Sequence, residues 1–108
     1  MSESPQRRFT VGASAAQREL LKTEAVWAIA NGLAAEFVAA LKEIEFRLTV
    51  EPNDWGESRE RLPVFRIQMR CGTSRMVTVL YGVAEDRDVV FVREYRVNHN
   101  WKPPPLSS

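Results

Sequence analysis

Three strand-like segments near the C-terminus constrain the fold more than any other feature. Residues 64–97 read VFRIQMRCGTSRMVTVLYGVAEDRDVVFVREYRV. In the segment Val64–Cys71, apolar and polar side chains alternate, which is typical of a half-buried strand. The side chains predicted to face the core are Phe65, Ile67, Met69 and Cys71. The side chains predicted to face outward are Arg66, Gln68 and Arg70.

Two further strands complete a predicted antiparallel sheet. The turn Gly72-Thr73-Ser74 leads into a strand over Arg75–Val83, and the acidic turn at residues 85–88 leads into a strand over Val89–Arg96. The last strand begins with VVFV, an apolar run that indicates burial on both faces and therefore a central position.

The N-terminal half predicts a short strand and two helices. A strand over Arg7–Val11 ends at Gly12, and Ser14 then begins a helix with Gln17 at the spacing of a capping box. Asn31-Gly32 ends this helix, because glycine adopts the left-handed conformation that closes helices. The second helix carries one apolar stripe, made of Leu33, Phe37, Leu41, Ile44 and Leu48. Residues 52–63, beginning with Pro52, are predicted to form a polar loop that contains Trp55.

The resulting fold class is α+β, with an N-terminal strand and a helical hairpin packed on a small, mainly antiparallel sheet. The 108 residues form a single domain, with an ordered core over about residues 8–97 and flexible tails at 1–6 and 102–108. The tail contains three consecutive prolines, which exclude a helix there.

Composition excludes several classes of function. The 44% of apolar and 27% of charged residues indicate a soluble globular chain. No apolar run reaches the roughly 20 residues that span a bilayer. The single cysteine and the lack of a secretory signal favour the cytoplasm, and one His with one Cys excludes a zinc site. No cofactor motif of the Walker or GxGxxG type occurs.

Charge is unevenly distributed although the net charge is only +1. Residues 1–58 hold six Lys/Arg and nine Asp/Glu, whereas residues 59–108 hold nine and five. The sheet half is therefore basic, which favours local contacts with phosphate or with an acidic partner.

Together these segments resemble the RelE/ParE superfamily of bacterial type II toxin–antitoxin toxins. The matching parts are the helical hairpin 14–50, the loop with Pro52, Trp55 and Gly56, and the segments FRIQMR (65–70), VLYGVAED (79–86) and VVFVREYR (89–96). The resemblance covers about residues 8–97. It implies a cognate antitoxin protein as partner, and either ribosome-bound mRNA as substrate (RelE-like) or DNA gyrase as target (ParE-like).

The resemblance also implies site residues. Arg66 and Gln68 fall at positions that contact the phosphate backbone in RelE-like members, and Arg70 and Arg75 are further basic candidates. Arg96 and His99 fall near the positions used for proton transfer. His99 is the only histidine, and an imidazole can act as acid or base near neutral pH.

One position departs from the RelE-like pattern. Thr78 stands where such enzymes place an arginine that stabilises charge on the phosphorane, and a threonine hydroxyl supplies no positive charge. The candidate catalytic set of Arg66, Arg96 and His99 is therefore degraded.

Two hypotheses remain open from the sequence. In one, the chain is a toxin-like RelE relative that cleaves mRNA or inhibits translation. In the other, it is a non-catalytic ParE-like or repurposed domain that binds gyrase or an antitoxin-like protein in the groove between helices and sheet.

Several conspicuous residues also have ordinary structural explanations. Trp55 and Trp101 either cover the rim of the core or stack on nucleobases. Cys71 alternates with apolar residues, which indicates a buried thiol and not a nucleophile.

Overall fold

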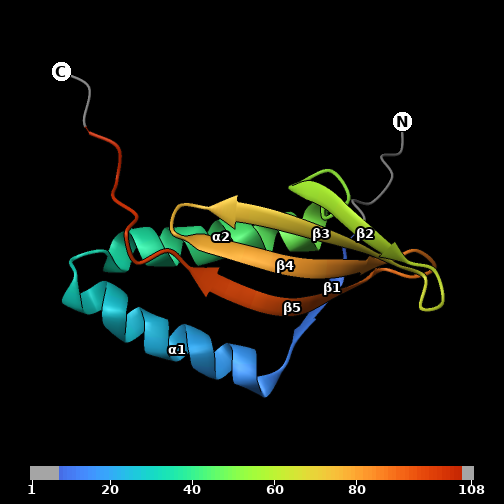
Figure 1. The fold of residues 1–108 in the computed structure, drawn as a ribbon, viewed down its shortest axis with the longest axis horizontal. Coiled ribbons are helices and arrows are strands. Elements are labelled where there is room, and N and C mark those ends of the chain that lie inside the picture. The colour runs from blue at the N-terminus through green and yellow to red at the C-terminus, as the bar shows by residue number, and fades with distance from the viewer. Residues whose placement is uncertain (1–7, 106–108) are drawn as a thin grey trace, which may run out of the picture.

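The computed structural model describes residues 8–105, so the predicted tail 1–6 and residues 106–108 lie outside the described residues. The elements are β1 (Thr10–Ala13), α1 (Ala15–Ala30), α2 (Ala34–Val50), β2 (Glu57–Leu62), β3 (Ile67–Ser74), β4 (Val77–Ala84) and β5 (Val89–Val97). The five strands form one sheet in the order β1-β5-β4-β3-β2 (Figure 1). β1 is parallel to β5 and all other neighbours are antiparallel. The α+β class is confirmed.

Both helices cover the same face of the sheet. The four core residues of β4, Val77, Val79, Tyr81 and Val83, alternate along the strand and therefore point to one side. They pack with Ala28 of α1 and with four residues of α2, namely Phe37, Ala40, Ile44 and Leu48. Neither of the two helices found within residues 8–105 lies on the opposite face (Figure 1). We call these two sides the helix face and the open face.

The predicted helix boundaries are confirmed. The Ser14 hydroxyl accepts a hydrogen bond from the Gln17 amide at 3.2 Å, which satisfies a free N–H of the first turn. Gly32, with a φ of 70°, follows the α1 C-cap and lets the chain reverse. α2 then runs back along the sheet (Figure 1). The predicted apolar stripe supplies three buried residues of α2, while Leu41 stays partly exposed.

The largest correction concerns residues 52–63, because the predicted polar loop contains the strand β2. β2 lies at the edge of the sheet and pairs only with β3. All of its side chains except that of Leu62 are exposed, so its sequence ESRERL carries no apolar alternation. An edge strand rich in charge resists pairing with other chains, which explains a strand without the usual propensity signal.

The hairpin turns also differ from the prediction. β3 starts at Ile67, because residues 63–66 form a turn in which the Arg66 amide donates to the Pro63 carbonyl. β3 continues through Gly72 and Thr73, and the reversal occurs at Arg75 and Met76. Arg75 has a φ of 52°, a conformation that glycine or asparagine adopts more readily, so the turn leaves no usual sequence signal.

β1 is shifted relative to the predicted strand Arg7–Val11. It runs from Thr10 to Ala13, and Gly12 lies inside it opposite Phe91 of β5. Arg7 lies outside the described residues. The strand continues until Ser14 caps α1, so the helix cap and not the glycine ends it.

β5 lies inside the sheet, as its apolar start predicted, between β1 and β4. Its burial is one-sided, however: Val90 and Val92 are buried and Phe91 is 40% exposed on the open face. None of the helices within residues 8–105 is long and apolar enough to cross a membrane.

Gly72 provides a test of the core packing. A Cβ atom at this position would lie 2.4 Å from the Trp55 ring, so Gly72→Ala must displace the indole. We expect a loss of about 1–3 kcal/mol in the free energy of unfolding, measured by urea denaturation. Gly12→Ala is the matched control, since nothing lies within 4 Å of its added Cβ. Equal stability of the two variants would contradict this packing.

Candidate functional site

The polar residues of β3 face the side opposite to the predicted one. Arg70 pairs with Tyr81 of β4, and Gln68 pairs with Val83, both of which belong to the core. Paired residues of antiparallel strands point to the same face, so Arg70 and Gln68 lie on the helix face. The predicted outward face shared by Arg66, Gln68 and Arg70 is therefore wrong, although the alternation itself is correct.

Arg70 stabilises the loop that joins α2 to β2 through two hydrogen bonds. Its Nε donates to the Trp55 carbonyl at 3.0 Å and its Nη2 donates to the Gly56 carbonyl at 3.2 Å. The Tyr81 hydroxyl donates to the carbonyls of Pro52 and Trp55, at 2.9 Å and 2.8 Å. Burial raises the pKa of Tyr81 and the nearby Arg70 opposes this effect. The phenol thus stays protonated at neutral pH, as donation requires.

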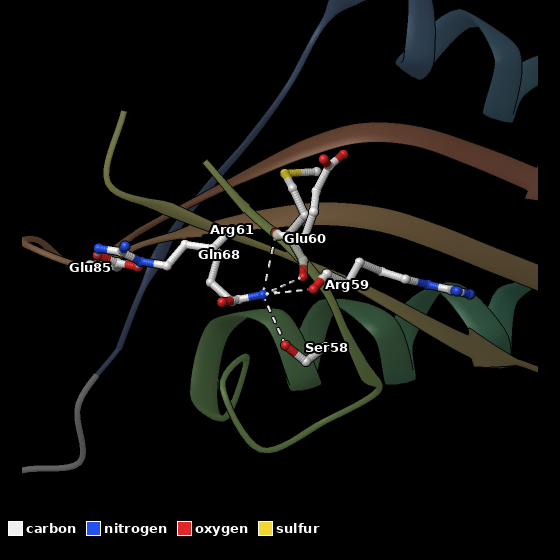
Figure 2. Close-up of polar contacts among 7 residues, drawn as sticks. Ser58, Arg59, Glu60, Arg61, Gln68 and Glu85 are labelled. Carbon is white, nitrogen blue, oxygen red and sulfur yellow. Dashed lines mark hydrogen bonds and ion pairs between the residues drawn. The ribbon is translucent and has the colours of Figure 1, made fainter. Parts of the chain in front are cut away.

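Gln68 fills the bulge of β2. The register of β2 against β3 shifts between Ser58 and Arg61, which leaves backbone carbonyls without ladder partners. Figure 2 shows the Gln68 amide nitrogen among these groups, 2.9 Å from the Ser58 hydroxyl and 3.3 Å from the Glu60 carbonyl. The amide thus supplies a donor to acceptors that the bulge leaves unpaired, and a phosphate contact would require it to leave them.

Arg66 and Arg75 lie at opposite ends of β3. Arg66 occupies the exposed turn before the strand. Arg75 occupies the turn after it, where its Nε is 3.0 Å from the Glu36 carboxylate and its Nη1 is 3.7 Å from that of Glu43. These ion pairs join the β3–β4 turn to α2, and they oppose binding of a phosphate by Arg75.

Arg96 lies on the open face beside a shallow cleft. It pairs with Thr78 in the register, and its Nε is 2.6 Å from the Glu94 carboxylate. A cavity of about 310 Å³ is lined by Arg59, Cys71, Thr78, Leu80, Glu94 and Arg96. Cys71 therefore faces the open side and is only partly buried, which corrects the predicted inward position.

His99 lies on the helix side of the molecule. Its Nε2 is 2.8 Å from the Glu24 carboxylate, and its ring lies 4.5 Å from that of Trp27, both on α1. Arg96 pairs with Thr78, and Thr78 pairs with Thr73 near the end of β3. Arg66 directly precedes β3 and is seven residues from Thr73, which corresponds to roughly 23 Å along a strand. The structure does not bring Arg66, Arg96 and His99 together.

Sequence reasoning did not name the residues of a groove between the helices and the β1–β5 edge of the sheet. This cavity of about 470 Å³ has an apolar floor and walls from Val11, Ala13, Leu21, Leu41, Ile44, Leu48 and Tyr95. Arg18 and Glu45 also line it and supply one charge of each sign. The available signal in the sequence was the apolar stripe itself, of which Leu33 and Leu41 stay partly exposed.

The groove is held by a polar contact between α1 and β5. The Gln17 side-chain carbonyl accepts a hydrogen bond from the Tyr95 amide at 2.8 Å. Burial is the main cause that raises the pKa of Tyr95, and the negative charge of Glu45 raises it further. The groove therefore contains a neutral phenol beside apolar walls.

Within residues 8–105, no three His, Cys, Asp or Glu side chains are grouped so that they could hold a metal ion. Comparisons with protein-family models, with curated proteins and with solved structures found no match.

Arg70 and Arg66 should differ in a stability measurement. Arg70→Ala removes two hydrogen bonds from a charged donor, and we expect a loss of about 1–3 kcal/mol in the free energy of unfolding. Arg66→Ala, at an exposed turn, should change stability by less than about 0.5 kcal/mol. Urea denaturation measures both. An Arg70→Ala protein as stable as the parent would show that Arg70 is available for a ligand.

The ion pair between Arg61 and Glu85 predicts a pH dependence. Arg61 holds the Glu85 carboxylate with contacts of 2.5 Å and 2.7 Å, seen at the left of Figure 2, and this hydrogen bonding lowers the pKa of Glu85. A lowered pKa contributes stability above the ordinary value of 4.5, and that contribution is lost as the pH falls through the lowered pKa.

Arg61→Ala should therefore return the Glu85 pKa toward 4.5. The difference in melting temperature from the parent should shrink between about pH 7 and about pH 3. NMR titration of the Glu85 carboxyl measures the first effect and thermal melting the second. Arg59→Ala, on the same strand, is the control for loss of one positive charge. An unchanged Glu85 pKa in Arg61→Ala would refute the pairing.

Proposed function

We propose that this chain is the toxin-like component of a type II toxin–antitoxin pair, related to the RelE/ParE toxins, and that it acts by binding and not by cleaving RNA. The sequence resemblance motivates the family. The observation that supports the mechanism is the separation of Arg66, Arg96 and His99, because proton transfer requires groups within hydrogen-bond reach of one substrate.

The state of the other basic candidates supports the same proposal. Arg70 and Gln68 donate to backbone carbonyls, and Arg75 and Arg96 are paired with carboxylates. A phosphate group would have to displace these partners before it could bind. Thr78, at the position where RelE-like enzymes use arginine, adds no positive charge on the open face.

The groove between the helices and β1–β5 is the proposed docking site for a segment of the cognate antitoxin. Its apolar lining resembles the grooves that receive apolar faces of peptide helices or strands. Arg18 and Glu45 at the groove each lack an ion-pair partner among residues 8–105, so they favour an occupant that carries an acidic and a basic side chain. Antitoxins of the RelE/ParE superfamily wrap around their toxins, and for this reason the proposed occupant is a segment of the antitoxin.

A binding experiment tests the docking site. The product of any short reading frame that adjoins this gene is co-purified with the chain, and the dissociation constant of the complex is measured by calorimetry. Leu21→Lys places an ammonium group in the groove and should weaken the complex by more than about tenfold. Val26→Lys, also on α1 but 67% exposed, should leave the affinity unchanged. Failure of the two proteins to associate, or equal weakening by both variants, would contradict the proposal.

An RNA assay in the same study tests the mechanism. Purified protein added to mRNA-programmed ribosomes should leave the mRNA intact. Cleavage that disappears in Arg96→Ala or His99→Ala would establish the catalytic RelE-like alternative. Melting curves of the Leu21→Lys and Val26→Lys proteins show whether both variants of the binding experiment still fold.

A further inference from the structure

A third cavity, of about 540 Å³, lies where the α1–α2 turn meets the segment after β5. Its volume falls within the range typical of small-ligand sites. Two indoles, an imidazole, two amides and an ammonium group line it, from Trp27, Trp101, His99, Asn31, Asn100 and Lys102. No Asp or Glu occurs among the described residues that line it.

A hydrogen-bonded turn fixes the wall formed by the C-terminal segment. The Asn98 amide donates to the Met76 carbonyl at 2.8 Å, which holds the end of β5 to the β3–β4 turn. The Asn98 side-chain carbonyl accepts from the Asn100 amide at 3.0 Å, and its main-chain carbonyl accepts from the Trp101 amide at 3.2 Å. Trp101 therefore packs against the edge of the core before any ligand arrives.

The opposite wall comes from α1 and is also held in place. The His99 ring lies against that of Trp27, with centroids 4.5 Å apart, and its Nε2 contacts Glu24 at 2.8 Å. The Asn31 amide nitrogen donates to the Trp27 carbonyl at 2.8 Å, and Asn31 also lines the cavity.

Trp101 and Trp55, the two indoles that the sequence singled out for base stacking, differ in the structure. Trp55 is stacked on Tyr81 at 6.0 Å and covers Gly72, and it also lines a separate cavity of about 310 Å³ together with Glu57 and Arg59. Trp101 lines the open cavity together with Lys102, which is exposed and has no carboxylate partner among residues 8–105. Trp101 therefore combines a ring surface with an exposed cation in a cavity whose described lining holds no carboxylate.

We propose that this cavity binds one nucleotide. The base lies against Trp101, because indole rings stack on any base. The amides of Asn31 and Asn100 meet the donors and acceptors at the edge of the base. Lys102 contacts the phosphate as a point charge. This inference does not depend on the proposed function, since neither the groove nor the open-face cleft shares a lining residue with the cavity.

The nucleotide has two possible sources, and the experiment separates them. Adenosine 5′-monophosphate and a single-stranded hexamer of adenylate are titrated into the full chain at physiological salt, and quenching of tryptophan fluorescence is followed. Lys102→Ala should weaken binding by about three- to tenfold, because one phosphate contact is lost. Lys42→Ala, an exposed charge on α2 away from the cavity, is the matched control and should bind as the parent does.

Trp101→Ala should weaken binding by at least about fivefold, and Trp101→Phe should retain most of it because a ring remains. Binding of both probes, or of the monophosphate alone, supports a site for free nucleotides. Binding of the hexamer alone supports a site for one nucleotide within a strand. Absence of binding at millimolar concentration, or equal weakening by Lys102→Ala and Lys42→Ala, would overturn the proposal.

Discussion

The tie between the α2–β2 loop and the middle of the sheet determines much of this structure. Tyr81, at the centre of β4, reaches the loop carbonyls through its hydroxyl, while Arg70 donates to the same loop from β3. Trp55 occupies the space that Gly72 leaves open. These contacts fix where the chain leaves α2, and so they set the place at which β2 joins the edge of the sheet. They also occupy the Arg70 guanidinium, because its Nε and Nη2 donate to the carbonyls of Trp55 and Gly56.

The fold was predictable where burial leaves a repeating pattern. The α2 stripe and the alternation in β3 and β4 each reflect one face turned to the core. The Ser14 cap was predictable for a different reason, since its hydroxyl satisfies a free N–H at the start of α1. β2 was missed because an edge strand without buried side chains has no such pattern. The direction of the β3 alternation was also missed. Arg70 and Gln68 are polar, but they can lie on the helix face because they donate hydrogen bonds to carbonyls of the α2–β2 loop and of the β2 bulge. The alternation of apolar and polar residues in the sequence does not show that these hydrogen-bond partners exist.

The candidate site shows the same division. Sequence pattern identified which side chains carry charge, but pairing decides whether that charge is available. Arg75 meets Glu36 across the β3–β4 turn, and Arg96 meets Glu94 two residues away on its own strand. Only the pair of Arg75 with Glu36 joins distant parts of the chain. The pair of Arg96 with Glu94 could have been predicted from the sequence, because side chains two residues apart on a strand point to the same face. The groove and the cavity lined by Trp27 and Trp101 could not be predicted, because both depend on how α1 packs against β5. The spacing of residues along the sequence does not show that packing.

The parallel pairing of β1 with β5 joins segments that lie far apart in the sequence, with Thr10 beside Val89. During synthesis the first strand therefore emerges long before its partner and waits without a neighbour. α1 and α2 form from local contacts and precede it, whereas the closing step is a long-range one and is correspondingly slow. Val11 and Ala13 line the groove from β1 and Tyr95 lines it from β5, so the groove is complete only after β5 has joined β1. A partner that recognises the groove would thus distinguish the completed sheet from a chain in which β5 is not yet paired.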